Sequence, residues 1–214
     1  CNFHGLNIFK KNKKHYEGFY LANKVKKISF KELNKLNKIL SIKIKKNIKL
    51  SKILKYNNYI TISPGGRIPE KRWNVTSWKI LIKKIISKNK NIKIVLLGTK
   101  KDKFQNIKIS NQFKKNILNL TGKTSFASLM SVINSSKIHI CHDDGTMHLA
   151  ILLQKKVLSL FHNIDFKEKW FQGHNSNHIQ LYGQNGVNGI KVQNVFSSFL
   201  KFKKIEKLIK NEKY

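Results

Sequence analysis

Two short polar segments each follow an apolar run directly and carry residue types that bind anions. The first is residues 63–67, Ser-Pro-Gly-Gly-Arg, and the cations Lys71 and Arg72 come soon after it. Gly65 and Gly66 allow the backbone to approach a ligand closely, and free amides near a helix start attract phosphate. The segment therefore favours a phosphate contact, with a plain turn as the alternative interpretation of Pro-Gly-Gly.

The second segment, residues 142–148, reads His-Asp-Asp-Gly-Thr-Met-His. Asp144 and Thr146 are residue types that cap helices, and Gly145 permits a tight turn before the helix begins. The alternative without a ligand is a well-capped helix with His148 packed in its first turns. Imidazole and carboxylate also ligate cations, so a metal site is a further alternative, with His142, Asp143, Asp144 and His148 as its ligands. We expect no metal here, because acidic residues at this place are typical helix caps.

Two weaker candidates lie between these segments. Residues 98–102 follow an apolar run, and the carboxylate of Asp102 is of the kind that hydrogen-bonds a ribose in nucleotide-binding folds. Residues 122–124 read Gly-Lys-Thr, like the end of a P-loop, but Ile117 stands where that loop requires its first glycine. We interpret this stretch as a helix start with Thr124 or Ser125 as the cap.

The elements that must position these segments follow from a regular alternation of apolar runs after Tyr59. Strands are predicted at residues 59–62, 92–97, 138–141 and 157–161, with amphipathic helices between them. Strands that are apolar on both faces imply a parallel sheet covered on both sides. The predicted fold class is therefore α/β, a Rossmann-like parallel sheet with helices on both faces. Such sheets bind ligands beyond the carboxyl ends of their strands, where the polar segments stand.

Three parts of the chain differ in pattern. Residues 1–56 hold a capping box, Ser29-Phe30-Lys31-Glu32, and a lysine-rich stretch, and we interpret them as the remnant of an N-terminal domain and a connector. Residues 57–190 are the predicted Rossmann-like domain. Residues 191–214 are predicted as a C-terminal amphipathic helix with an apolar stripe. Because the chain begins with Cys1 rather than Met, we expect it to start within a longer product.

Lysine dominates the charge of the chain. The formal net charge is +34, from 44 Lys and Arg against 10 Asp and Glu. Such a charge is typical of proteins that bind nucleic acid or an anionic membrane, but lysines recur on nearly every predicted helix, which favours a general compositional bias. The two cysteines exclude a disulfide framework, and no apolar run approaches the roughly 20 residues that span a bilayer. We expect a cytoplasmic protein with peripheral contact at the inner membrane and no specific nucleic-acid partner.

Taken in order, these motifs resemble the ADP-heptose:lipopolysaccharide heptosyltransferase family, whose members have the two-domain GT-B fold. The resemblance covers about residues 59–182. Its stretches are Ile62-Ser63-Pro64-Gly65-Gly66, Lys71-Arg72-Trp73, Ile94-Val95-Leu96-Leu97-Gly98, residues 119–125, residues 142–150, Val157-Leu158-Ser159-Leu160-Phe161 and Trp170-Phe171. The resemblance implies that this chain is the C-terminal half, which binds the nucleotide sugar. It also implies that the last helix returns toward the N-terminal domain, the alternative being a helix packed on its own sheet.

Residue roles follow from the same resemblance. Lys71 is implied to neutralise the diphosphate, Asp102 to stand where an acidic residue meets the ribose, and His148 to support the loop at residues 144–146, whose amides hold the phosphates. Asp144 departs from the Ser or Thr usual in the family and places a carboxylate near the expected diphosphate. The full predicted donor-binding set is Ser63, Gly65, Gly66, Arg67, Lys71, Arg72, Asp102, Asp143, Asp144, Gly145, Thr146 and His148.

The implied activity is an inverting, metal-independent transfer of a sugar, heptose by resemblance, from a nucleotide sugar to a lipopolysaccharide-type acceptor. The resemblance places the catalytic base in the N-terminal domain, so no catalytic residue is expected in this chain, and no cofactor beside the ADP-heptose-type substrate. Expected partners are therefore the nucleotide sugar, the acceptor and the N-terminal domain. Two alternatives stay open: a basic nucleic-acid-binding module, and a decayed, inactive relative of the transferases.

Overall fold

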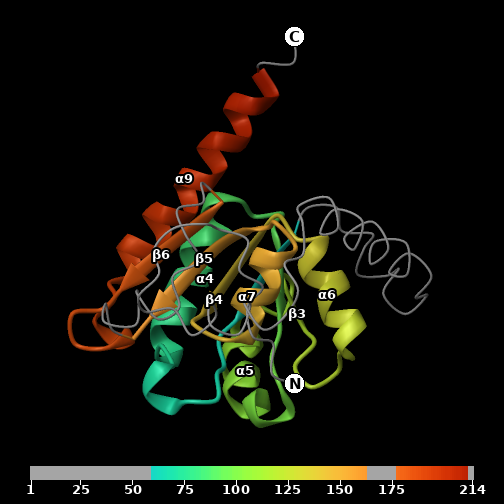
Figure 1. Cartoon of the computed structure of the whole chain (residues 1–214), viewed down its shortest axis with the longest axis vertical. Coiled ribbons are helices and arrows are strands. Elements are labelled where there is room, and N and C mark those ends of the chain that lie inside the picture. Colours follow the sequence, from blue (N-terminus) through green and yellow to red (C-terminus); the bar gives the residue numbers. More distant parts are fainter. Residues whose placement is uncertain (1–58, 163–176, 212–214) are drawn as a thin grey trace, which may run out of the picture.

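A computed structural model describes residues 59–162 and 177–211, with side chains as far as Phe202. Its centre is a six-stranded sheet in the order β3-β2-β1-β4-β5-β6, and every neighbouring pair is parallel (Figure 1). The strands are β1 (Tyr59–Ser63), β2 (Lys93–Leu96), β3 (Ile117–Asn119), β4 (Ile138–His142), β5 (Lys156–Phe161) and β6 (His178–Tyr182). The α/β class with a parallel, Rossmann-like sheet is thus confirmed. The capping box at Ser29 lies outside the described residues, and the domain limits at residues 56 and 190 stay predictions.

Helices connect the strands and begin where capping side chains stand. They are α4 (Val75–Lys88), α5 (Lys103–Ser110), α6 (Phe126–Asn134), α7 (Gly145–Leu152) and α9 (Val192–Asn211), with short 3-10 turns η1 (Pro69–Lys71), η2 (Lys100–Asp102), η3 (Asn111–Phe113) and η4 (Val187–Gly189). Asn74 caps α4, Ser125 caps α6 and Asp144 caps α7, each accepting a hydrogen bond from a backbone amide of the first turn. Helix starts at Ser125 and Asp144 are therefore as the sequence indicates.

Helices α4, α5 and α9 cover one face of the sheet. Side chains alternate along a strand, so Ile60 and Ile62 of β1 both point to this face and join its core. The helices contribute Trp78, Leu81, Ile82 and Ile85 from α4, Ile109 from α5, and Val195, Phe199 and Phe202 from α9. This core fixes the start of α4 against the carboxyl end of β1 and β4.

Helices α6 and α7 cover the opposite face, which is partly polar. Its apolar core includes Tyr59 of β1, Val132 of α6 and Met147 of α7. Between them, Thr61, His139 and Ser159 are fully buried on neighbouring strands. Buried polar groups need hydrogen-bond partners, and those of Thr61 and His139 lead toward the start of α7, as described below.

The final helix packs on its own sheet as far as its side chains are described. Val195, Phe199 and Phe202 are buried, and Phe196 stacks on Phe199 with ring centroids 6.4 Å apart. This part of α9 therefore agrees with the alternative interpretation, a helix packed on its own sheet, and not with a return toward the N-terminal domain. The helix begins at Val192 and its later turns extend beyond the sheet (Figure 1). Within the described residues, no helix is long and apolar enough to cross a membrane.

Three elements at the periphery were not predicted. Both β3 and β6 are edge strands, and edge strands lack the two-sided apolar pattern that reveals central ones. Strand β3 has three residues, and β6 alternates polar and apolar side chains in His-Ile-Gln-Leu-Tyr. Helix α5 buries only Asn106 and Ile109, so it shows almost no apolar stripe.

Candidate functional site

The order of the strands reverses between β1 and β4. From β1 the chain crosses to β2 and β3 on one side, and β4, β5 and β6 follow on the other. In open α/β sheets, ligands bind outside the carboxyl ends of the strands at this reversal. The loops after β1 and β4 therefore leave the sheet side by side. The predicted convergence of the segments around Gly65 and Gly145 at one sheet edge is confirmed.

His142, the last residue of β4, joins both ends of the loop that follows β1. Its Nε2 accepts a hydrogen bond from the amide of Trp73 at 2.8 Å, and Nδ1 lies 2.9 Å from the carbonyl oxygen of Gly65. Because Nε2 accepts, the ring proton belongs on Nδ1, which donates to Gly65. Burial lowers the pKa of His142 to about 4, so the ring is neutral at pH 7. One neutral imidazole thus closes the loop that carries residues 66–72.

A second link between the two loops is ionic. Lys71 Nζ lies 2.8 Å from Oδ2 of Asp143, and their side chains are only 16% and 5% exposed. Lys71 ends the short turn η1, and Asp143 directly follows β4. The cation predicted to meet a diphosphate is therefore held at the meeting point of the two loops.

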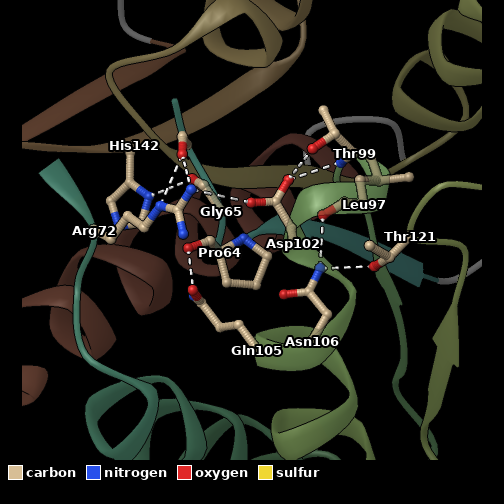
Figure 2. Close-up of polar contacts among 11 residues, drawn as sticks. Pro64, Gly65, Arg72, Leu97, Thr99, Asp102, Gln105, Asn106, Thr121 and His142 are labelled. Carbon is tan, nitrogen blue, oxygen red and sulfur yellow. Dashed lines mark hydrogen bonds and ion pairs between the residues drawn. The ribbon is translucent and has the colours of Figure 1, made fainter. Parts of the chain in front are cut away.

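Arg72 points inward and binds the same loop (Figure 2). Its Nε donates to the carbonyl of Gly66 at 2.7 Å, its terminal nitrogen also contacts that carbonyl, and the same nitrogen lies 3.6 Å from Oδ1 of Asp102. Asp102 in turn accepts from the Thr99 amide at 2.8 Å and the Thr99 hydroxyl at 2.7 Å. Arg72 and Asp102 therefore tie the ends of β1 and β2 together.

Gly65 is required because the Asp102 carboxyl packs directly against its backbone. A Cβ on Gly65 would lie 2.3 Å from both Cγ and Oδ1 of Asp102, far inside contact distance. Gln105 supports the same loop by donating to the carbonyl of Pro64 at 2.8 Å (Figure 2). The predicted close backbone approach at Gly65 is thus used within the chain, to seat a buried carboxylate.

Asp102 is 4% exposed, and its two oxygens face Thr99 and Arg72. In this arrangement the carboxylate stabilises the loops of the site. A ribose contact of Asp102 stays a prediction. Neighbouring Asn106 donates to the carbonyl of Leu97 and to the hydroxyl of Thr121, which anchors α5 to the ends of β2 and β3 (Figure 2).

Asp144 occupies the start of α7. Its Oδ1 accepts from the amides of Thr146 at 2.7 Å and Met147 at 3.2 Å, and from the Thr146 hydroxyl at 2.7 Å. Burial, with a smaller contribution from the charge of Asp143, raises the pKa of Asp144 to about 6 and outweighs these hydrogen bonds. The Thr146 amide, one of those predicted to hold phosphate, is therefore already bonded to this side chain, and so is the next amide, that of Met147.

Other predicted residues lie around this core of the site. Ser63, at the end of β1, is 2% exposed. Arg67 is exposed on the loop after β1, and His148 is half-buried on α7, where burial lowers its pKa. Gly145 is the exposed first residue of α7, and an added Cβ there would meet no atom within 4 Å. All twelve predicted residues stand at the carboxyl edge, and their contact with a donor stays a prediction.

His142, one of the four ligands of the alternative metal site, is not free to bind a metal ion. Both ring nitrogens of His142 are bonded to backbone groups of the β1 loop, so this side chain has no free lone pair for a metal. Within residues 59–162 and 177–202, no group of three or more His, Cys, Asp or Glu side chains is arranged to hold a metal ion.

The structural roles of His139 and His142 were not predicted from the sequence. His142 entered only as a metal candidate, and His139 only as part of a strand. His139 lies between the hydroxyls of Thr61 at 2.9 Å and Thr146 at 3.0 Å. A possible signal is an imidazole at two positions of an otherwise apolar strand, Ile-His-Ile-Cys-His, because buried histidines are rarely without a specific partner.

The strand order and the meeting of the loops after β1 and β4 define a doubly wound α/β domain of the class that binds ligands at the switch point. The pattern of glycosyltransferase family 9 (heptosyltransferase) matches residues 15–192. The chain belongs to this family of glycosyltransferases. Among proteins with curated functions, no sequence matches it.

Solved structures share the fold at low sequence identity. An E. coli ADP-heptose lipopolysaccharide heptosyltransferase II is 22% identical with a TM-score of 0.62, over 70% of this chain and 47% of that one. A family 9 glycosyl transferase from Veillonella parvula is 14% identical with a TM-score of 0.64, over 91% of this chain and 62% of that one. An E. coli heptosyltransferase solved with ADP is 17% identical with a TM-score of 0.54, over 67% of this chain and 43% of that one. The chain thus spans about half the length of these structures.

Proposed function

We propose that this chain binds the donor of a sugar-transfer reaction, a nucleotide sugar of the ADP-heptose type, in the crevice between the loops after β1 and β4. The observation that carries the proposal is the convergence of these loops, joined by His142 and by the Lys71–Asp143 ion pair. Membership of glycosyltransferase family 9 supports the reaction class. The heptosyltransferase solved with ADP supports an adenosine diphosphate as the leaving group.

The proposed chemistry makes two demands on a transferase. An acceptor hydroxyl attacks the anomeric carbon with inversion, and the nucleoside diphosphate leaves with growing negative charge. In this proposal, Lys71 and the amide end of α7 stabilise that charge without a metal. The acceptor proton needs a base, which we assign to the N-terminal half of the family's fold. A lipopolysaccharide-type acceptor at the cytoplasmic side of the inner membrane completes the proposal.

Isothermal titration of the 214-residue chain with ADP tests donor binding. Lys71→Ala removes a charge-assisted contact to phosphate, which should raise the dissociation constant for ADP about 10- to 100-fold. Lys83→Ala is the matched control, since Lys83 is an exposed lysine of α4 away from the crevice, and it should change the constant less than twofold. Melting temperatures of both variants show whether Lys71→Ala leaves the fold intact.

The basic nucleic-acid-binding alternative predicts the opposite pattern. In that case the chain would bind an oligonucleotide more tightly than ADP, with an affinity that falls linearly in log salt, and both lysine variants would weaken it equally. Such a result would remove the donor-binding proposal.

A further inference from the structure

The start of α7 already holds an anion that belongs to the chain itself. The carboxylate of Asp144 accepts hydrogen bonds from the amides of Thr146 and Met147. The proposed function brings a diphosphate to this end of α7, so phosphate oxygens and the carboxylate would draw on the same positive end of the helix. Two anions at one site raise each other's affinity for protons.

The buried hydroxyl of Ser63 is a second, independent observation at this edge of the sheet. Ser63 is 2% exposed, and no described residue gives its hydroxyl a hydrogen-bond partner. Ser63 ends β1, lies on the same face of the sheet as Thr61, and pairs in register with Cys141 of β4. Thr61 is joined through His139 to Thr146 on α7, so Ser63 stands one step nearer the site edge beside α7. Buried hydroxyls are rarely left unpaired, which favours a ligand contact here.

A buried chain of polar groups leads from Asp144 into the sheet. The Thr146 hydroxyl lies 2.7 Å from Asp144 Oδ1 and 3.0 Å from Nε2 of His139. Nδ1 of His139 lies 2.9 Å from the hydroxyl of Thr61. Thr61 has further acceptors in the Ser136 hydroxyl at 3.2 Å and the Ile138 carbonyl at 3.4 Å.

The hydrogen bonds of this series, from Asp144 through Thr146 and His139 to Thr61, can all be made with the donors and acceptors in either of two opposite orders. When Asp144 is ionised, Thr146 donates to it, His139 donates from Nε2 to Thr146, and Thr61 donates to Nδ1. When Asp144 carries a proton, it donates to Thr146, Thr146 donates to Nε2, and His139 donates from Nδ1 to Thr61. The Thr61 hydroxyl then turns to Ser136 or Ile138. The contacts between neighbours in this series are kept in both cases, while the hydroxyl protons turn round, Asp144 gains a proton and the neutral His139 ring changes its tautomer.

We propose that Asp144 takes up one proton from solvent when the diphosphate of the donor binds, and that His139 changes from its Nε2–H to its Nδ1–H tautomer at the same time. The inference rests on the proposed function, because it requires a diphosphate at the start of α7. His139 acts here as a positioning residue through Thr146, and the proton neutralises the carboxylate that faces the incoming anion.

The charges around Asp144 fit this change. Burial brings the pKa of Asp144 to about 6, close enough to neutrality that a second anion moves it into the working range. Burial lowers the pKa of His139 to about 3, so its ring stays neutral and only the tautomer changes. Among the described residues, the other ionisable groups near Asp144 are Asp143, Lys71 paired with Asp143, Cys141, His148, and beyond them His178 and Tyr182.

Calorimetry with ADP on the full chain tests the proton uptake. Titrations between pH 6 and pH 8, in buffers of different ionisation heat, give the dissociation constant and the protons taken up. For the natural sequence, the affinity should fall by up to about tenfold per pH unit above the pKa of the group that must be protonated. Asp144→Asn keeps an oxygen acceptor at the helix start but has no charge to neutralise. It should bind about 10- to 100-fold more tightly at pH 8 and show no such fall.

Titration of ADP itself affects both proteins equally, so the difference between them reports Asp144. Nitrogen-15 spectra of the histidine rings should show the tautomer of His139 change when ADP binds to the natural sequence and stay fixed in Asp144→Asn. If Asp144→Asn is unstable, Asp144→Ser replaces it as the uncharged variant. Equal affinities with equal pH dependence, or an unchanged His139 spectrum, would overturn the inference and leave donor binding standing. Absence of ADP binding in every protein at every pH would overturn the proposed function itself.

Discussion

Replacing Gly65 by alanine should destabilise the protein strongly, although the added methyl group is small. The new Cβ would lie 2.3 Å from Cγ and Oδ1 of Asp102. Ordinary carbon contacts are about 3.5–4.0 Å, so the carboxyl group must move by more than 1 Å. That movement breaks its bonds to the amide and hydroxyl of Thr99, which are 2.8 Å and 2.7 Å long. It also separates the carboxylate from Arg72.

The magnitude follows from those lost contacts. Hydrogen bonds to a charged group contribute about 1.5–3 kcal/mol each, and part of the loss is recovered as the displaced carboxylate meets water. We therefore expect the free energy of unfolding to fall by about 2–4 kcal/mol. Urea titration followed by the fluorescence of the buried Trp73 and Trp78 measures this change.

Two controls isolate the cause. Gly66→Ala stands in the same loop, where the nearest atom to a new Cβ is 4.0 Å away, and should change the stability by less than about 0.5 kcal/mol. Asp102→Ala removes the clashing atoms, so adding Gly65→Ala to it should have little further effect, which is a large coupling in a double-mutant cycle. Equal stability losses from Gly65→Ala in the presence and absence of the Asp102 carboxyl would refute the close-packing argument.

The remaining predictions concern the buried histidines. The pKa values of His139 and His142 are about 3 and about 4 in the folded chain, below the ordinary 6.5, so their stabilisation is complete above pH 6.5 and is lost as the pH falls toward these values. Asp144 acts in the opposite sense between pH 4 and pH 6, since its pKa is raised, and these three groups together should lower the stability at pH 5 by about 3 kcal/mol. The pKa of His178 is also lowered by burial, so it adds to this loss, which denaturant midpoints from pH 7.5 to pH 5 measure. A stability that is flat or rises on acidification would contradict the buried neutral state of these rings. His142→Ala should release the loop after β1 at both ends, so hydrogen exchange should quicken for the amide of Trp73 and its loop but not for the distant strand β6. Unchanged exchange at Trp73 would show that His142 does not hold the loop.

The central strands and the convergence of the site follow from sequence because their causes are local. Strands β1, β2, β4 and β5 are largely apolar and buried, and the first three are followed at once or after one residue by a Ser, Gly or Asp signal. A parallel sheet then brings the carboxyl ends to one edge whatever the details. The caps at Ser125 and Asp144 also depend only on residues within one helical turn.

The interactions that shape the site depend on partners far apart in the chain. His142 binds residues 69 and 77 positions away, and Lys71 pairs with Asp143 across 72 positions. No local pattern indicates such pairs. The role of Asp102 shows the same limit, because its carboxylate is enclosed by Gly65 and Arg72 from another loop. Strands β3 and β6 were not predicted because their own local pattern is weak: an edge strand is covered less completely and carries fewer apolar residues.

Synthesis on the ribosome exposes β1 for a long interval. This strand comes first among the described elements yet lies in the middle of the sheet. Strand β4 covers the second edge of β1, and His139 of β4 is synthesised 78 residues after its partner Thr61. At about 5–20 residues per second, that delay is roughly 4–16 s. An unpaired apolar strand edge is a template for association with other chains. Faster translation between β1 and β4, or a chaperone that shields the open edge of β1 during this interval, should therefore raise the soluble yield more than added stability in the finished fold.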